Sequence, residues 1–584
     1  MATDYKNINQ IWAAIAVVTL KRLGLKTAVI CPGSRSTPLT MAFVEESPHI
    51  ELISILDERS AAFFALGKAK ITGLPTVLVC TSGTAGANFY PAVIEAKESR
   101  VPLIILTADR PPELRDCHSG QTIDQVKLYG DYVNWQTELA TPIADIGILR
   151  YVRQMLTYGW ERALSPVPGV VHINVPLRDP LPPIPHQNQL QAQSLELLKS
   201  QFQLEEFLDG VTNTTSLENF DDKLPILPEW QQCDRGIIIA GVAQPLQVEK
   251  YCLVIAQLAK SLQYPVLAEG LSPVRNYAEI NPYIISTYDS ILRNPQLAHQ
   301  LTPQIVIQVG DTPTSKQLRQ WLSSISAQRW VIDHTYQNLD PLHGKTIHLR
   351  CKTNSCAYSK LQQEDKPGDF LKIWLSAETQ VRQSIDNCLM QIEDICEVKL
   401  AWFLSQNLPP ETPIFIANSM PVRDVEFFWK PNNSHIIPYF NRGANGIDGT
   451  LSTALGTAHR QQGSVMLTGD LALLHDTNGF LLRNKFVGHL TIILINNNGG
   501  GIFEMLPIAE FNPPFEEFFA TPQDIDFHKL CATYGVKHEL ITSWQQLGDR
   551  LQTLSSKEIR VLEIRTNRHL DANWRKENLG KFAI

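Results

Sequence analysis

Short apolar runs alternate with longer amphipathic stretches along most of the chain. This pattern is typical of βαβ units, in which parallel strands form a sheet and helices cover its faces. A first set of strands is predicted at residues 27–31, 50–56, 76–80, 103–107 and 169–175. After the second of these strands, the alanine-rich stretch 60–70 is predicted to form a helix.

Two further sets of apolar runs predict two further parallel sheets. The second set comprises residues 236–241, 265–268, 304–310, 330–333 and 346–349, and the third comprises residues 413–417, 435–439, 465–469, 490–496 and 560–563. Polar, proline-containing stretches separate the three sets. We therefore expect three α/β domains at 1–182, 233–351 and 373–584, a linker at 183–232 with one helix near 194–208, and a second linker at 352–372.

The composition narrows the class of protein. A chain of 584 residues is longer than one hydrophobic core usually spans, and a net charge of −8 argues against an extended nucleic-acid surface. No apolar run is as long as a membrane span, and the first residues lack the basic segment of a secretion signal. Ten cysteines without a CxxC pair favour reduced thiols over disulfides or a zinc site. These features predict a cytoplasmic protein.

A candidate metal site lies in the third set of strands. Gly469 and Asp470 end one apolar run, and Asn497 follows the next run in the sequence Ile495-Asn-Asn-Asn-Gly-Gly500. A carboxylate, an amide oxygen and a loop carbonyl are ligands that a hard divalent cation prefers. A cation with so few protein ligands usually completes its coordination with water and substrate phosphates, so the pattern also predicts a bound diphosphate. Two ordinary turns are the alternative interpretation.

Three other segments combine polar side chains with the ends of predicted strands. Glu58 lies where a strand leads into the alanine-rich helix, and a Ser/Thr/Gly turn at 81–84 follows another strand. The loop 441–449 contains three glycines together with Arg442 and Ile447. Read from the residues alone, these features also fit an acidic residue at a helix start, a helix-capping turn and a core isoleucine.

The spacing of Gly-Asp and Asn-Asn resembles the diphosphate-binding motif of thiamine diphosphate-dependent enzymes. The resemblance implies the three-domain fold of that superfamily, with a pyrimidine-binding domain, a central domain and a diphosphate-binding domain. It also implies that Asp470, Asn497 and the Gly499 carbonyl hold Mg²⁺, with Mn²⁺ as a substitute. Leu471 stands where the superfamily usually has glycine. Glu58 matches the glutamate that hydrogen-bonds the cofactor's aminopyrimidine.

Four motifs narrow the resemblance to one branch of the superfamily: Cys31–Thr40, Asp109–Asp116, Ala417–Arg423 and Asn441–Gly449. Its members are transferases of menaquinone and phylloquinone biosynthesis. They decarboxylate 2-oxoglutarate and add the resulting four-carbon unit to isochorismate. Both substrates carry carboxylates, which forked guanidinium groups bind with high geometric specificity. The chain supplies arginines for this purpose in loops that follow predicted strands, namely Arg35, Arg110, Arg423 and Arg442.

The resemblance assigns further residues to the site. The expected catalytic residues are Glu58, Arg35, Arg423 and Arg442. Expected cofactor contacts are Glu58, Thr81, Gly83, Ser419, Ile447, Gly469, Asp470, Leu471, Asn497, Gly499 and Ile502. Expected substrate contacts are Ser34, Arg35, Arg110, Gln121, Lys316, Ser419, Arg423, Arg442, Ile502, Phe503 and Leu506. Some relatives have arginine directly after the position of Lys316, whereas this chain has Gln317. This difference weakens the expectation that the central domain helps to bind isochorismate.

Two alternative functions remain open at this point. An acetolactate synthase-like or 2-oxoacid decarboxylase activity keeps the cofactor but needs no set of arginines. A non-catalytic nucleotide- or flavin-binding regulatory protein is the other, although the chain lacks a GxGxxG turn. Since the cofactor of this superfamily binds between domains of different subunits, a homodimer or homotetramer is expected.

Overall fold

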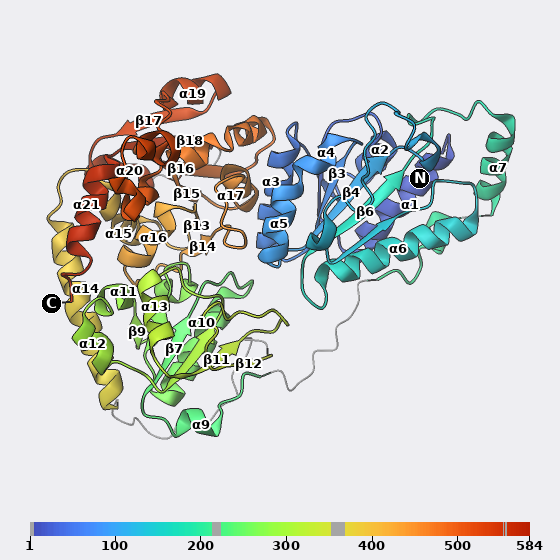
Figure 1. Ribbon diagram of the computed structural model, residues 1–584. Coiled ribbons are helices and arrows are strands. Elements are labelled where there is room, and N and C mark those ends of the chain that lie inside the picture. The colour runs from blue at the N-terminus through green and yellow to red at the C-terminus, as the bar shows by residue number, and fades with distance from the viewer. Residues whose placement is uncertain are drawn as a thin grey trace. The chain divides into compact units, whose positions relative to one another are not determined.

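The computed structural model describes residues 5–201, 203–212, 223–351, 368–552, 554 and 558–583 (Figure 1). In this part of the chain the strands form three six-stranded sheets, and all pairs of named strands are parallel. Helices flank each sheet, so the predicted α/β class with three mainly parallel sheets is confirmed.

The first sheet has the strand order β2-β1-β3-β4-β6-β5. Its strands are β1 (Thr27–Ile30), β2 (Glu51–Ser54), β3 (Thr76–Cys80), β4 (Leu103–Asp109), β5 (Trp135–Glu138) and β6 (Val170–Pro176). Its helices are α1 (Ile8–Leu23), α2 (Thr37–Glu45), α3 (Glu58–Thr72), α4 (Thr84–Asn88), α5 (Tyr90–Glu98) and α6 (Ile146–Leu164), with single turns η1 (Pro112–Leu114) and η2 (Gly130–Tyr132). Helices α3 and α5 lie on one face of the sheet, and α1 and α6 lie on the other (Figure 1).

Helix α1 illustrates why these elements form. The side chain of Asn7 accepts a hydrogen bond from the Gln10 N–H at the start of the helix, and Gly24 ends it in the left-handed conformation at φ 110°. Most of the helix is apolar and buried in the core of the first sheet. Such a helix is held by its packing more than by its propensity.

The second sheet has the order β12-β11-β10-β7-β8-β9. Its strands are β7 (Gly236–Ala240), β8 (Val266–Ala268), β9 (Ile284–Ile285), β10 (Ile305–Val309), β11 (Gln328–Ile332) and β12 (Thr346–Leu349). Its helices are α9 (Pro228–Gln231), α10 (Val248–Leu262), η3 (Pro273–Asn276), α11 (Tyr288–Ile291), α12 (Pro295–Gln300) and α13 (Lys316–Ser324). Helix α10 covers one face, and α11 and α13 cover the other.

The third sheet, β14-β13-β15-β16-β18-β17, repeats the order of the first. Its strands are β13 (Pro413–Ile416), β14 (Ile437–Tyr439), β15 (Ser464–Gly469), β16 (His489–Asn496), β17 (Lys537–Ile541) and β18 (Glu558–Arg565). Its longer helices are α14 (Asp369–Met390), α15 (Glu397–Asn407), α16 (Met420–Phe428), α17 (Thr450–Ala458), α19 (Phe527–Tyr534), α20 (Trp544–Gln552) and α21 (Arg568–Asn578). Short turns are α18 (Asp470–Leu474), η4 (Thr477–Asn484), η5 (Gly501–Met505), η6 (Pro507–Glu510) and η7 (Glu516–Ala520).

The contacts divide the chain into two compact units. The first unit combines the described residues within Met1–Ser216 with the segments Asn441–His459 and His475–Val487. The second unit contains the second sheet and all six strands of the third. In the first predicted linker, helices α7 (Gln189–Ser200) and α8 (Leu204–Phe207) lie near the single helix expected there. Residues 352–367 of the second predicted linker lie outside the described residues. The predicted domain boundaries therefore stay predictions.

None of the helices that the structure describes is both long enough and apolar enough to cross a membrane.

Candidate active site

The loops that follow β1, β3 and β4 bring several predicted site residues together in the first unit. Arg110 Nη1 donates to Ser82 Oγ at 2.8 Å, and Gln121 Nε2 donates to the Ser82 carbonyl at 2.9 Å. A Cβ atom on Gly33 would lie 2.2 Å from Thr81 Cβ, so the loop that carries Ser34 and Arg35 lies directly against the loop that carries Thr81 and Gly83. These loops leave the carboxyl ends of their strands, which is where ligands bind in parallel α/β sheets.

Gly83 is required by its backbone conformation and by its neighbour. Its φ is 85°, which side chains rarely adopt, and an added Cβ would lie 2.9 Å from Gln121 Cγ. The Gly83 N–H donates to Gln125 Oε1 at 2.8 Å, so Gln125 holds the turn in place. Gln125 could not be predicted as a site residue, because no spacing or composition signal in the sequence marks it.

Two of the predicted arginines, Arg35 and Arg110, lie close together among the loops that follow β1, β3 and β4. Arg35 is buried, and its Nη1 donates to the Leu177 carbonyl at 2.9 Å. Burial and, after it, the charge of Arg110 lower the pKa of Arg35. The buried Nε of Arg35 has no hydrogen-bond partner among the residues that the structure describes. Two neighbouring guanidinium groups with unused donors form a site for an anionic, carboxylate-bearing ligand.

Glu58 is the first residue of α3 and is half-buried. Asp57 precedes it and accepts hydrogen bonds from the N–H groups of Arg59 and Ser60, so Asp57 caps the helix. The side chain of Glu58 is therefore not needed as a cap. Burial raises the pKa of the Cys80 thiol, and the negative charge of Glu58 adds to this effect. The charge of Glu58 also contributes to the raised pKa of the buried Cys31 thiol. The carboxylate of Glu58 therefore lies beside the ends of β1 and β3.

The glycine-rich loop 441–449 also belongs to the first unit. Glu95 of α5 accepts hydrogen bonds from the Gly443 N–H at 2.9 Å and from the Ala444 N–H at 2.7 Å. These bonds fasten the loop to α5 and place Arg442 and Ile447 in the same unit as Glu58. Both side chains are half-buried.

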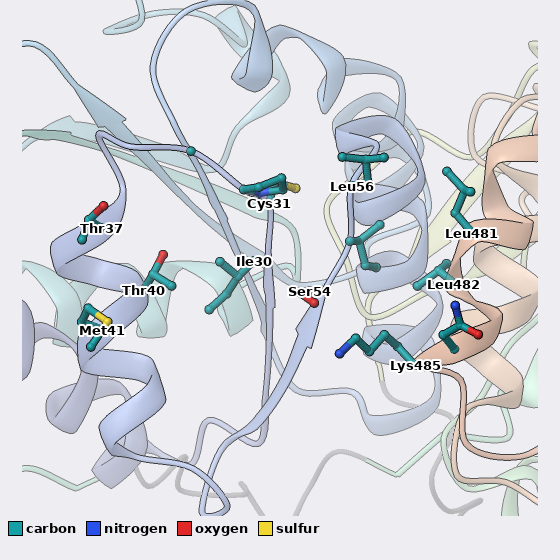
Figure 2. Close-up of a pocket in the computed structure, with 14 residues that line it drawn as sticks. Ile30, Cys31, Thr37, Thr40, Met41, Ser54, Leu56, Leu481, Leu482 and Lys485 are labelled. Carbon is teal, nitrogen blue, oxygen red and sulfur yellow. The ribbon is translucent and has the colours of Figure 1, made fainter. Parts of the chain in front are cut away.

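A separate cavity of about 470 Å³ opens beside the ends of β1 and β2 (Figure 2). Thr37, Thr40 and Met41 line one side, and Leu481, Leu482 and Lys485 line the other. The remaining lining residues are Ile30, Cys31, Pro32, Gly33, Ser54, Ile55, Leu56 and Asn484. None of the predicted site residues lines this mostly apolar cavity, so it is not the candidate site.

In the second unit, Asp470 and the loop 497–499 meet at the carboxyl ends of the adjacent strands β15 and β16. The Asp470 carboxylate accepts hydrogen bonds from the Leu471 N–H at 2.7 Å and the Gly499 N–H at 2.8 Å. Burial raises the pKa of Asp470 to about 6 against the opposing effect of these bonds. A cation beside this carboxylate would favour its charged form.

Asn497 completes the donor set for a cation. Its Oδ1 is buried and has no hydrogen-bond partner among the described residues, while its Nδ2 donates to Glu397 Oε1 at 2.5 Å. Gly499 has a φ of 142°, and its carbonyl accepts from the Gly501 N–H at 2.9 Å, which leaves one lone pair for a ligand. A buried carboxylate, an unused amide oxygen and a loop carbonyl fit a hard divalent cation.

Ser419 and Arg423 lie at the end of β13 and the start of α16. Ser419 has φ 74° and ψ −130°, which is a strained conformation for any residue with a Cβ. Arg423 Nη1 donates to the Ser419 carbonyl at 2.6 Å. Strain of this kind gathers at functional sites, and it supports a role for Ser419 that a glycine would not serve as well.

The remaining predicted residues lie in the second unit, on more exposed elements. Ile502 and Phe503 are half-buried on η5, directly after the Asn497 loop, and Leu506 is exposed. Lys316 is exposed at the first position of α13. Gln317, which departs from some relatives, donates from Nε2 to the Leu292 carbonyl at 3.0 Å.

Glu397 is a further residue that the sequence analysis missed. It begins α15 at a position without a motif, and only the fold brings it against Asn497.

Comparison with known proteins gives a consistent result. The model described as "Thiamine pyrophosphate enzyme, N-terminal TPP binding domain" matches residues 12–128, and the model described as "Middle domain of thiamine pyrophosphate" matches residues 211–416. The 2-succinyl-5-enolpyruvyl-6-hydroxy-3-cyclohexene-1-carboxylate synthase of a Nostoc species is 66% identical over 100% of this chain and 99% of its own length. The synthase of the same name from Gloeothece citriformis is 61% identical over 100% of both chains.

A solved structure with a similar fold is benzoylformate decarboxylase from Polynucleobacter necessarius. Its TM-score is 0.64 at 15% identity, and the match covers 95% of this chain and 98% of that one. At this identity the similarity shows the fold alone.

Proposed function

The chain belongs to the 2-succinyl-5-enolpyruvyl-6-hydroxy-3-cyclohexene-1-carboxylate synthase family of thiamine pyrophosphate enzymes, and on this basis we propose the reaction that it catalyses. It is a transferase that decarboxylates 2-oxoglutarate and adds the four-carbon unit to isochorismate, in menaquinone or phylloquinone biosynthesis. The structural observation that supports this choice most directly is the group formed by Arg35, Arg110 and Gln121 at the strand ends of the first sheet.

When bound, thiamine diphosphate supplies the electron sink that decarboxylation of a 2-oxo acid requires. Glu58 would hydrogen-bond the ring nitrogen of the aminopyrimidine and hold the proton that is exchanged there. It is half-buried at the strand ends beside Cys31 and Cys80. Thr81, Gly83 and Ile447 would line the cofactor.

Asp470, Asn497 and the Gly499 carbonyl would hold Mg²⁺, or Mn²⁺ as a substitute, and the cation would bind the diphosphate. The unused Oδ1 of Asn497 supports this assignment, because a buried amide oxygen without a partner costs free energy unless a ligand satisfies it. Gly469 and Leu471 flank the aspartate and would position the diphosphate through their backbone.

The arginines select substrates with two carboxylates. Arg35 and Arg110, with Ser34 and Gln121, lie in the first unit, and Arg442 lies there too. Arg423 and Ser419 lie in the second unit, with Ile502, Phe503 and Leu506 as the apolar side of the site and Lys316 as a further cation. Pyruvate offers one carboxylate and gains less from such a set.

We further propose that the active form is a homodimer or homotetramer, and that one cofactor uses Glu58 of one copy and Asp470 of another. The resemblance to thiamine diphosphate enzymes supports this arrangement. The cysteines at the described positions are all free thiols, which supports a reducing compartment such as the cytoplasm.

The second sheet argues against the alternative of a non-catalytic nucleotide- or flavin-binding regulatory protein. Dinucleotides bind where the strand order of such a sheet reverses, here between β7 and β10. In this chain the two loops at that point pair with each other, because Asp311 N donates to the Val242 carbonyl at 3.0 Å and Val242 N donates to the Asp311 carbonyl at 3.2 Å. This bridge closes the crevice that a nucleotide would need.

A donor comparison tests the proposed function. The purified protein, with thiamine diphosphate and Mg²⁺, should release carbon dioxide from 2-oxoglutarate much faster than from pyruvate. Glu58→Gln should lower turnover about 100-fold or more, since a positioned acid–base group contributes at least that much. Preference for pyruvate would favour the acetolactate synthase-like alternative, and a Glu58→Gln variant with unchanged turnover would refute the role of Glu58.

A further inference from the structure

The buried carboxylate of Glu397 lies behind the candidate metal site rather than in it. Glu397 is 1% exposed at the start of α15, and its Oε1 accepts the hydrogen bond from Asn497 Nδ2. Thr566 Oγ1 donates to the same oxygen at 3.1 Å. The other oxygen, Oε2, accepts from Arg575 Nη2 at 2.9 Å.

Arg575 holds this carboxylate in a fixed orientation. Its Nε and Nη2 donate to the two oxygens of Asp424 at 2.8 Å and 2.6 Å, in the bidentate geometry that orients a guanidinium group. Asp571 accepts from the Glu397 N–H at 3.1 Å. The cluster ties the start of α15 to α16 and α21 and to the loop after β16.

The chemistry of the two facing groups determines which way the Asn497 amide points. A carboxylate that is ion-paired with Arg575 only accepts hydrogen bonds, whereas an amide has one donating and one accepting end. Asn497 must therefore turn its NH₂ group toward Glu397, and its Oδ1 faces the opposite way, where it has no partner among the described residues.

We propose that Glu397 is a positioning residue that aims the Asn497 oxygen at the cation. The inference rests on the proposed function, since it assumes that Asn497 is a metal ligand. Without Glu397, the amide could turn by half a rotation and present its NH₂ group to a divalent cation, which an N–H donor repels. Partners of this kind behind metal ligands typically change metal affinity about 10- to 100-fold when they are altered.

The isosteric substitution Glu397→Gln tests this directly. Arg575 can only donate, so the new amide must turn its oxygen to Arg575 and its NH₂ group to Asn497. Asn497 then has to rotate to accept, and its own NH₂ group points at the cation. We expect the affinity for Mn²⁺ in the presence of thiamine diphosphate, measured by electron paramagnetic resonance titration, to fall about tenfold or more.

A double variant restores a donor–acceptor hydrogen bond between positions 397 and 497 without restoring Glu397. In Glu397→Gln combined with Asn497→Asp, one oxygen of the aspartate accepts from the glutamine NH₂ group and the other faces the cation. We expect the double variant to bind Mn²⁺ clearly more tightly than Glu397→Gln alone. Asn497→Asp alone places two carboxylates against each other and should bind Mn²⁺ worse than the double variant.

Glu563→Gln is the matched control. Glu563 is fully buried and accepts from Asn496 Nδ2 at 2.7 Å, so the neighbouring asparagine makes the same kind of bond. Asn496 Oδ1 already accepts from the Asn498 N–H at 3.3 Å, and Mn²⁺ affinity should not change in this variant.

Several results would overturn the inference: Mn²⁺ affinity unchanged in Glu397→Gln, an equal loss in Glu563→Gln, or no recovery in the double variant. If the Glu397→Gln variant does not fold, the Mn²⁺ affinity of the double variant tests the inference instead, because that variant carries the same glutamine at position 397. A wild-type protein that binds no Mn²⁺ with thiamine diphosphate would instead refute the proposed function.

Discussion

Ser419, a candidate site residue, has a backbone conformation that is strained for serine. Its φ of 74° is one that glycine adopts freely and serine does not, yet the chain keeps a serine at the start of α16. The Ser419 carbonyl also accepts the hydrogen bond from Arg423. The resemblance to thiamine diphosphate enzymes pointed to Ser419, but the sequence gives no sign of its strained backbone.

Ser419→Gly should therefore raise stability and lower activity. Relief of the strained backbone should increase the free energy of unfolding by about 1 kcal/mol, and loss of the hydroxyl group should reduce kcat/KM. Thermal unfolding and steady-state kinetics measure the two effects. Ser323→Gly, at an exposed position within α13, is the control and should be destabilising. A Ser419→Gly variant less stable than the wild type would show that the residue is not strained.

Residue patterns predict some members of the site and cannot predict others. Asp470 and Asn497 follow apolar runs at a characteristic spacing, so the sequence predicts both as metal ligands. Glu397 lies 100 residues before Asn497, and Arg575 lies 178 residues after Glu397. Only tertiary packing brings such partners together, and no local pattern records it.

At the scale of elements, α3 and α17 cross at two glycines within the first unit. A Cβ atom on Gly67 would lie 2.3 Å from the Thr453 carbonyl oxygen, and one on Gly456 would lie 2.2 Å from the Phe64 carbonyl oxygen. Backbone atoms cannot move aside as side chains do, so the crossing requires glycine at both positions.

Gly67→Ala should destabilise the protein by about 1–3 kcal/mol, which is the usual cost of overpacking. The matched control is Gly548→Ala in α20, where the nearest atom to the added Cβ is Phe403 Cζ at 3.5 Å. That control should be neutral or stabilising by up to about 1 kcal/mol, because alanine favours helix. Thermal unfolding at one protein concentration compares the two variants. Equal shifts in both would contradict a tight crossing.

The elements that the sequence failed to predict share a position. The missed strands β5, β9 and β17 each form one edge of a sheet, whereas all of the predicted runs correspond to observed strands. Strand β5, Trp135–Glu138, is only half-buried throughout, and β9 has two residues. These three edge strands have fewer neighbours to bury them and lack the apolar runs from which the opposite edge strands β2, β12 and β14 were predicted.

At the scale of the whole molecule, buried histidines should make stability depend on pH. His172 in β6 and His489 in β16 are buried, and burial lowers their pKa to about 3 and about 4. Because folding depresses these values, the stabilisation is complete above pH 6.5, the ordinary value, and is lost as the pH falls toward the folded-state pKa.

Between pH 7 and pH 5, His172 should remove about 2 kcal/mol from the free energy of unfolding. In His172→Gln the group no longer titrates, so the melting temperature should fall less over this interval than in the wild type. His49→Gln, at an exposed position, serves as the control and should follow the wild type. Parallel pH profiles for wild type and His172→Gln would contradict the prediction.

The first and third sheets have the same strand order, and each presents its candidate residues at the carboxyl ends of its strands. Glu58, Arg35 and Arg110 lie at the first sheet, and Asp470 and Asn497 lie at the third. The sequence predicts this organisation because the apolar runs and the polar residues after them are local features. The assembly of the complete site from two copies is not local and stays a proposal.

The most direct test of the proposed function is mass spectrometry of the reaction product. The purified protein is incubated with thiamine diphosphate, Mg²⁺ and ¹³C-labelled 2-oxoglutarate, with isochorismate present or omitted. We predict a product that combines the labelled four-carbon unit with isochorismate, formed only when both substrates and the cofactor are present. Labelled carbon that never appears in an isochorismate adduct, with the wild-type protein folded and loaded with cofactor, would contradict the proposed function.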